Sequence, residues 1–141
     1  PAATSTSATT SPALRYATVT PPTTSQQSTP RLTGVPVVLA NDSTFDREYS
    51  TSPVPVVINF TAKWCGPCHG VSRSLDQLAV EKAGRVKVLR IDFDQSPGLV
   101  RRYNISALPA VLVVRDGVVV KRMVGSQSRD NLSAAVGLVA P

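Results

Sequence analysis

The sequence has 141 residues, enough for one ordinary domain, and its formal charge of +6 comes from scattered basic residues that do not suggest a nucleic-acid-binding protein. No apolar run approaches the ~20 residues of a membrane-spanning helix, so we expect no membrane segment. Cys65 and Cys68 are the only cysteines, so no framework of several disulfides supports the chain, and the pair is better suited to chemistry.

Residues 1–33 are rich in Ser, Thr, Pro, Ala and Gln, with two arginines and no acidic residue. Such a segment buries too little apolar surface to offset the entropy of ordering, so we expect a disordered leader or linker. A Ser-rich segment without acids is typical of the end of an organellar transit peptide, and we expect a mitochondrial location. The alternatives are a plastid location and a Pro/Thr-rich stalk on a periplasmic or secreted domain.

The folded domain is expected over residues 34–141, where strand and helix patterns alternate. Val35 to Leu39 predicts a short strand, and a cap within Asn41–Ser43 predicts a helix that runs to about Tyr49. The β-branched and aromatic run from Pro55 to Thr61 is typical of a strand that is buried on both faces.

The middle of the domain predicts a long helix, a strand and a short helix. Apolar residues at three- and four-residue spacing indicate an amphipathic helix from near Pro67 to Gly84. A further strand is expected from Val86 to Phe93, and a short helix from Pro97 to Tyr103.

The end of the chain predicts a β-hairpin and a last helix. Two strand-like runs, Ala110–Arg115 and Val118–Val124, are joined by Asp116-Gly117, a dipeptide typical of tight hairpin turns. Ser128 is suited to cap a final helix that is apolar on one face. Strands joined through helices imply parallel pairing and the hairpin adds an antiparallel edge, so we predict an α/β fold with a mixed sheet and helices on both faces.

The segment Trp64 to Cys68 reads WCGPC and lies where the second strand leads into the long helix. Cysteines three residues apart at a helix start lie on one face, so their sulfur atoms can form a disulfide. The helix N-terminus presents free N–H groups that stabilise a thiolate at Cys65, and we expect Cys68 to point into the domain. Pro67 suits an early helical position, and we expect Trp64 to shield one side of the pair rather than fill the core.

The letters from Cys65 to His69 also spell C-x-x-C-H, the attachment signature of a c-type haem. A haem would usually need a second axial ligand, and the only methionine, Met123, falls within a predicted strand. A structural zinc site needs four ligands, of which Cys65, Cys68 and His69 supply at most three. We therefore expect no metal and no bound cofactor, and a solvated His69.

Three stretches resemble thioredoxin: VVINFTAKWCGPC, RIDFDQSPGLVRRYNISALPAVLVVRDG and RMVGSQSRDNL. The resemblance covers about residues 35–139 and implies the thioredoxin fold, with Cys65 as attacking thiol and Cys68 as resolving thiol of a protein-disulfide reductase. It also implies protein disulfides as substrates, re-reduction by a thioredoxin reductase or an equivalent dithiol donor, and a cis peptide bond before Pro109. We expect a monomer that binds its substrate across Trp64, Gly66, Pro67, Leu108, Pro109 and Gly125.

Three positions depart from the family pattern: Asn59 replaces a buried aspartate, Thr61 an aromatic residue and Ala110 a threonine. By the resemblance Arg90 occupies the site of a buried lysine, and we expect it to turn to Asp92 on the same strand face. The missing carboxylate predicts a more oxidising dithiol and a slower resolving step. The alternatives are an interaction module of the same fold with weak turnover, and an oxidising enzyme of the periplasm or secretory route.

Overall fold

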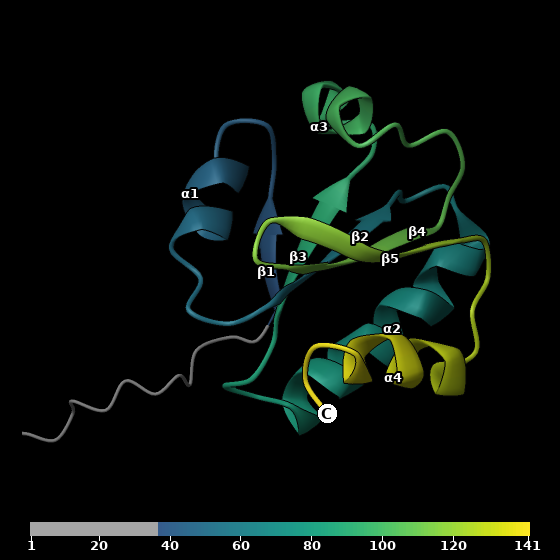
Figure 1. Ribbon diagram of the computed structural model, residues 1–141. Coiled ribbons are helices and arrows are strands. Elements are labelled where there is room, and N and C mark those ends of the chain that lie inside the picture. Colours follow the sequence, from purple (N-terminus) through teal and green to yellow (C-terminus); the bar gives the residue numbers. More distant parts are fainter. Residues whose placement is uncertain (1–36) are drawn as a thin grey trace, which may run out of the picture. The chain divides into compact units, whose positions relative to one another are not determined.

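The computed structural model describes residues 37–141 and contains a five-stranded mixed sheet with helices on both faces, as predicted (Figure 1). The strands are β1 (Val37–Ala40), β2 (Val56–Thr61), β3 (Lys87–Asp92), β4 (Ala110–Arg115) and β5 (Val118–Val124). The helices are α1 (Phe45–Ser50), α2 (Gly66–Glu81), α3 (Pro97–Arg102) and α4 (Arg129–Gly137). The predicted leader over residues 1–33 lies outside the described residues.

The strand order is β1-β3-β2-β4-β5. The strand β3 pairs in parallel with β1 and β2, whereas β4 pairs antiparallel with both β2 and β5. The expectation that β4, which follows a helix, would run parallel to its neighbour in the sheet was wrong. The six residues of α3 rise only ~9 Å, less than the ~20 Å length of a six-residue strand, so α3 by itself does not carry the chain back to the start of β3. The chain therefore re-enters the sheet at the same end at which β3 leaves it, and β4 runs in the opposite direction.

Two helix starts show how side chains set the boundaries. The Asn41 side chain accepts hydrogen bonds from the backbone N–H groups of Ser43 (2.9 Å) and Thr44 (3.1 Å), which forms a turn before the helix. For this reason α1 begins at Phe45, later than the cap residues suggested. At α4 the predicted cap is confirmed, since Ser128 Oγ accepts a hydrogen bond from the backbone N–H of Asn131 at 3.1 Å.

The core consists of one apolar layer on each face of the sheet. One layer packs α2 and α4 against the sheet, and the other packs α1 and α3 against the opposite face. Side chains alternate along β2, so Val57 faces α2 and α4 while Ile58 and Phe60 face α1 and α3. By the same alternation Asn59, which follows Ile58, faces α2.

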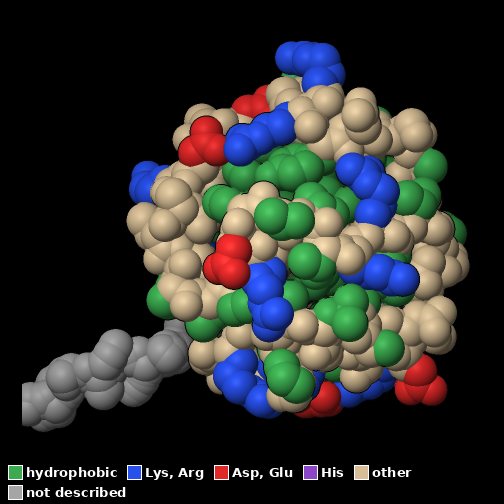
Figure 2. Space-filling model, viewed as in Figure 1, with side chains coloured by type: hydrophobic (Ala, Val, Ile, Leu, Met, Phe, Trp, Pro, Cys, Tyr) green, Lys and Arg blue, Asp and Glu red, His purple; other side chains and the backbone are tan. Residues whose placement is uncertain are grey.

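The edge strand β5 is the most exposed strand of the sheet. Figure 2 shows hydrophobic side chains gathered over this strand, with Lys and Arg side chains around them. Val118, Val120 and Val124 are 60%, 42% and 49% exposed, respectively. Within residues 37–141, no helix combines the length and apolar character needed to cross a bilayer.

Candidate active site

The two cysteines lie at the junction of β2 and α2. The buried strand β2 ends at Thr61, and a short loop leads to Cys65, which is the N-cap of α2 and has an extended backbone (φ −93°, ψ 105°). The backbone N–H of Cys65 donates to the carbonyl of Ala62 at 3.1 Å, which holds the loop closed. Pro67 lies in the first turn of α2, where its missing N–H costs no hydrogen bond.

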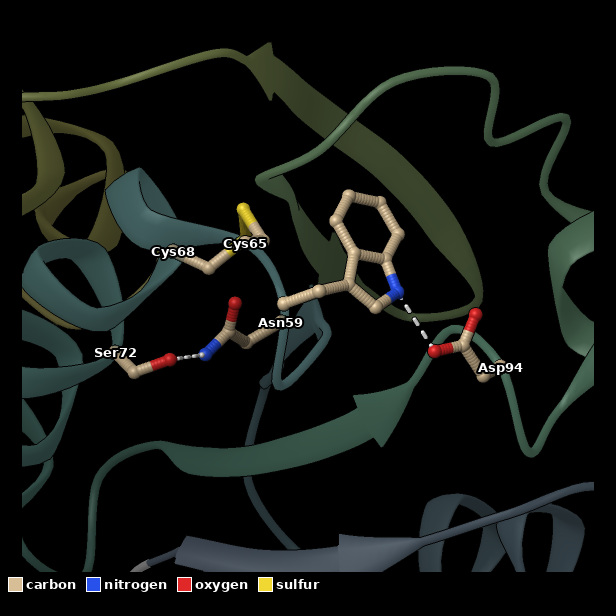
Figure 3. Close-up of a disulfide and its surroundings, with 6 residues drawn as sticks. Asn59, Cys65, Cys68, Ser72 and Asp94 are labelled. Carbon is tan, nitrogen blue, oxygen red and sulfur yellow. Dashed lines mark hydrogen bonds between the residues drawn. A yellow bond between two sulfur atoms is a disulfide. The ribbon is translucent and has the colours of Figure 1, made fainter.

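Cys65 and Cys68 form a disulfide, with Sγ atoms 2.13 Å apart and Cα atoms 5.4 Å apart (Figure 3). Cys68 is completely buried, whereas Cys65 keeps 5% of its surface exposed. No acidic residue lies in the first turn of α2, so the positive end of the helix dipole is not neutralised next to the pair. This setting stabilises a thiolate at Cys65, the sulfur at the helix end.

Trp64 is a surface residue beside the disulfide. Its side chain is 66% exposed, which excludes a role as core filling. The indole Nε1–H donates a hydrogen bond to Oδ2 of Asp94 at 2.7 Å. Asp94 therefore orients the ring, a role that the sequence reading did not assign to it.

The loop before β4 lies against the dithiol. Leu108 packs on the buried cluster formed by Ala62 and the two cysteines. The Leu108–Pro109 peptide bond is cis, as the resemblance implied. The backbone N–H of Gly125 donates to the carbonyl of Pro109 at 2.8 Å, so the loop after β5 is tied to the same place. Gly66 and Pro67 at the start of α2 are exposed, whereas Leu108 and Gly125 are half-buried and Pro109 is buried.

Asn59 is fully buried on β2, on the sheet face that α2 covers. Its Nδ2 donates a hydrogen bond to Ser72 Oγ at 3.0 Å. Its Oδ1 accepts no hydrogen bond from any residue between 37 and 141. In Figure 3 this oxygen points toward the two cysteines, while the nitrogen points toward Ser72.

Arg90 is the neighbour of Asn59 on β3, but it does not turn to Asp92 as expected. Its Nη2 forms an ion pair with Oδ1 of Asp76 on α2. The Asp92 carboxylate is engaged elsewhere, because its Oδ1 accepts the backbone N–H groups of Asp94 (2.8 Å) and Gln95 (3.2 Å). The Nε of Arg90 is buried and has no partner within the described part of the chain.

Ser72 and Asp76 are site residues that the sequence reading missed. Cys68, Ser72 and Asp76 follow one another at four-residue intervals, so they form a polar stripe along one face of α2. The stripe faces the adjacent pair of Asn59 and Arg90 on the sheet. The four-residue spacing from Cys68 was a signal in the sequence that could have revealed both residues.

A cavity of about 460 Å³ opens beside the site. Its lining includes Lys63 and His69, which flank the cysteine motif, as well as Ser72 and Arg90. His69 is exposed, in agreement with the solvated position expected for it. Over residues 37–141 there is no group of three or more His, Cys, Asp or Glu side chains that could hold a metal ion.

The arrangement of the C-x-x-C-H segment differs from what haem attachment requires. The sulfur atoms of Cys65 and Cys68 are bonded to each other, whereas a haem would need a thioether bond at each. Met123, the only methionine, packs in the core layer beneath α2 and α4 and is 8% exposed. The geometry supports a reversible dithiol.

Comparison with known proteins matches residues 36–137 to the family described as Thioredoxin. Thioredoxin 1 of Nostoc sp. is 36% identical over 92 residues, which are 65% of this chain and 86% of that protein. Thioredoxin of Allochromatium vinosum is 36% identical over 98 residues, or 70% and 92% of the two chains. Thioredoxin M-type, chloroplastic, of Pisum sativum is 35% identical over 100 residues, or 71% and 58%. The family match spans every strand and helix of the described region.

Proposed function

Because this chain belongs to the thioredoxin family and reduces protein disulfides through a dithiol, we propose that Cys65 is the attacking thiol and Cys68 the resolving thiol. The observation that carries this assignment is the difference in burial. Cys65 keeps some exposed surface at the N-terminus of α2, whereas Cys68 has none. Only Cys65 can therefore meet a disulfide on another protein.

The exchange proceeds in two substitutions at sulfur. The Cys65 thiolate attacks one sulfur of the substrate disulfide, and the other substrate sulfur leaves as a thiolate that takes up a proton. Cys68 then loses its proton and attacks Sγ of Cys65, which releases the second substrate sulfur. The substrate gains two electrons, and the domain ends with the Cys65–Cys68 disulfide seen in the structure.

The substrate binds as an extended segment beside Pro109, by pairing of backbone groups as in strand addition. The exposed Trp64 ring, held by Asp94, covers one flank of this segment. The other flank is formed by Leu108, which packs against the cysteines, and by Gly125, which is tied to Pro109. Contacts of this kind depend little on substrate sequence, so we propose a broad substrate range.

The partners of the chain are disulfide-containing proteins and a reductase that returns Cys65 and Cys68 to the dithiol. We propose that this donor is a thioredoxin reductase and that the chain acts as a monomer.

We further propose that the protein works in an organelle. The acid-free, Ser- and Thr-rich composition of residues 1–33 and the similarity to chloroplastic thioredoxins of Spinacia oleracea and Pisum sativum support this location. A plastid and a mitochondrion are the two candidates, and imaging of the full-length protein in its own cell distinguishes them.

Trapping of the mixed disulfide tests the assignment of the two cysteines. A Cys68→Ser variant incubated with insulin should accumulate a covalent adduct through Cys65, because the second substitution is blocked. The matched Cys65→Ser variant should form no such adduct, since its remaining thiol is buried. Peptide mapping by mass spectrometry identifies the linked residue. An adduct that forms only through Cys68 would overturn the assignment.

A further inference from the structure

Asn59 carries an unused hydrogen-bond acceptor in the oxidised state. The residue has no exposed surface, and its Oδ1 accepts no hydrogen bond from the described residues, although its Nδ2 is bonded to Ser72. Buried amide oxygens nearly always find a donor, so an acceptor left without one needs an explanation. A donor that exists in only one redox state would provide it.

The position of Ser72 fixes which end of the amide faces the cysteines. Ser72 follows Cys68 by four residues on α2, so the two side chains lie on one face of the helix, one turn apart. Ser72 Oγ accepts the hydrogen bond from Nδ2 of Asn59 at 3.0 Å, which turns Oδ1 in the opposite direction. Figure 3 shows the result, with this oxygen pointing toward the disulfide.

We propose that Ser72 is a positioning residue that holds Asn59 so that Oδ1 accepts a hydrogen bond from the Cys68 thiol in the reduced protein. The inference rests on the proposed role of Cys68 as the resolving thiol. In the disulfide, Sγ of Cys68 carries no proton and can donate nothing. As a thiol it becomes a donor, and the oxygen is the end of the amide that can receive it.

Reduction of the disulfide creates the Cys68 S–H group. A dithiol donor supplies two electrons, its own sulfur atoms become joined, and the bond between Cys65 and Cys68 breaks. One of the two protons released by the reducing dithiol ends on Cys68 Sγ. The other ends on Cys65, or in solvent when Cys65 is a thiolate.

The hydrogen bond stabilises only the reduced protein and therefore makes the couple more oxidising. It is lost when Cys68 gives up its proton, so it also slows the resolving step. The Asn59 amide stays uncharged over the whole working pH range, unlike a carboxylate. The contribution of Asn59 to the redox equilibrium should therefore change little with pH, as long as Cys68 remains a thiol.

The redox equilibrium of a Ser72→Ala variant tests the proposal. Without the Ser72 hydroxyl the amide loses its anchor, and in a dithiothreitol redox buffer the equilibrium should shift about fivefold toward the disulfide, which corresponds to ~20 mV. Ser72→Thr keeps the hydroxyl and should retain the wild-type equilibrium. The control is Ser74→Ala, a half-buried position on the same helix, which should also match the wild type. An unchanged equilibrium in Ser72→Ala, or a shift toward the dithiol, would overturn the proposal.

The S–H stretching band gives a second readout that does not depend on the equilibrium. In a Cys65→Ala background Cys68 carries the only thiol, and its infrared band should lie at lower frequency when Ser72 is present than in the Cys65→Ala/Ser72→Ala variant. Equal frequencies would contradict the hydrogen bond. Neither measurement uses a protein substrate, so a failure of insulin reduction would refute the proposed function and leave both readouts interpretable.

Discussion

Asn59 is the residue at which this site departs most from the family pattern. An uncharged amide lies buried on the face of β2 that α2 covers. By the resemblance, this is the position of a buried aspartate in thioredoxins. A carboxylate there could accept the proton of the resolving thiol, and an amide cannot. Its negative charge would also make a nearby thiolate less stable, so its absence favours the reduced protein.

Restoring the carboxylate should reverse both effects. We expect Asn59→Asp to lower the redox potential by roughly one tenfold step in the equilibrium constant, ~30 mV, and to speed release of substrate from the mixed disulfide. Equilibration with dithiothreitol gives the first quantity and stopped-flow kinetics the second. As a control, Asn131→Asp makes the same charge change at an exposed position on α4. It should alter neither the redox potential nor the rate of substrate release. If Asn59→Asp also leaves both unchanged, the amide has no influence on the dithiol.

The surroundings of Asn59 show where sequence reasoning reached its limit at this scale. The burial of Asn59 follows from the apolar run of β2, and the dithiol from the motif itself. The ion pair of Arg90 with Asp76 could not be predicted from strand alternation, which placed Arg90 beside Asp92. The partner comes from α2, and only the packing of that helix on the sheet determines which of its side chains Arg90 reaches.

Among the elements, α3 is held in place by a side chain from the loop between β1 and α1. Asp42, in the turn between β1 and α1, accepts the backbone N–H groups of Gly98 (2.8 Å) and Leu99 (2.8 Å) at the start of α3. A carboxylate there satisfies two of the free donors of the helix and interacts favourably with its dipole. This contact was not predictable, because the two residues are far apart in sequence.

The close approach of Asp42 requires glycine at position 98. A Cβ atom at Gly98 would lie 3.0 Å from Cγ of Asp42, so Gly98→Ala should displace the carboxylate and lower the free energy of unfolding by ~1 kcal/mol. Chemical denaturation measures the change. Gly70→Ala on α2 is the matched control, because a Cβ atom added there would have no neighbour within 4 Å. This substitution should stabilise the protein by up to ~1 kcal/mol. A Gly98→Ala variant as stable as the wild type would contradict this account of α3.

The contact between α1 and β3 should make stability depend on pH. Lys87 Nζ donates to Oε1 of Glu48 at 2.8 Å, and this hydrogen bond, helped by the positive charge of Lys87, lowers the pKa of Glu48. A pKa that is lower in the folded chain adds stability above the unfolded value of 4.5, and that stability is lost as the pH falls through the folded value. Glu48→Gln should therefore be less stable than the wild type at pH 7, with a difference that shrinks in acid. Denaturation midpoints of both proteins at pH 7 and pH 3 measure this difference. A stability difference between Glu48→Gln and the wild type that is the same at both pH values would refute the role of the Glu48 carboxylate.

Most elements could be predicted from the sequence, because their patterns are local. The β4–β5 strands were predicted with their observed bounds, since the Asp116-Gly117 turn has the positive φ angles (51° and 81°) that a tight hairpin needs. The direction of β4 relative to β2 was not predicted, because it depends on how far α3 carries the chain. The start of α1 was missed for a local reason, as Asn41 forms a turn instead of the cap.

In the described domain as a whole, the sheet brings the site together from distant parts of the sequence. The dithiol follows β2, the loop before β4 supplies Leu108 and Pro109, and the loop after β5 supplies Gly125. These segments meet because β2, β4 and β5 are neighbours in the sheet. Composition and periodicity predicted the class of fold, but only the resemblance indicated which loops would meet at the dithiol.

The central claim is that this dithiol turns over as a reductase of protein disulfides, and insulin reduction with dithiothreitol as donor tests it most directly. Catalytic amounts of the chain should precipitate the insulin B chain well before dithiothreitol alone does, and Cys65→Ala should abolish the acceleration because the attacking thiolate is gone. A pure interaction module of the same fold would still titrate reversibly between dithiol and disulfide. Reversible titration together with an insulin reduction rate no faster than that of dithiothreitol alone would contradict the claim.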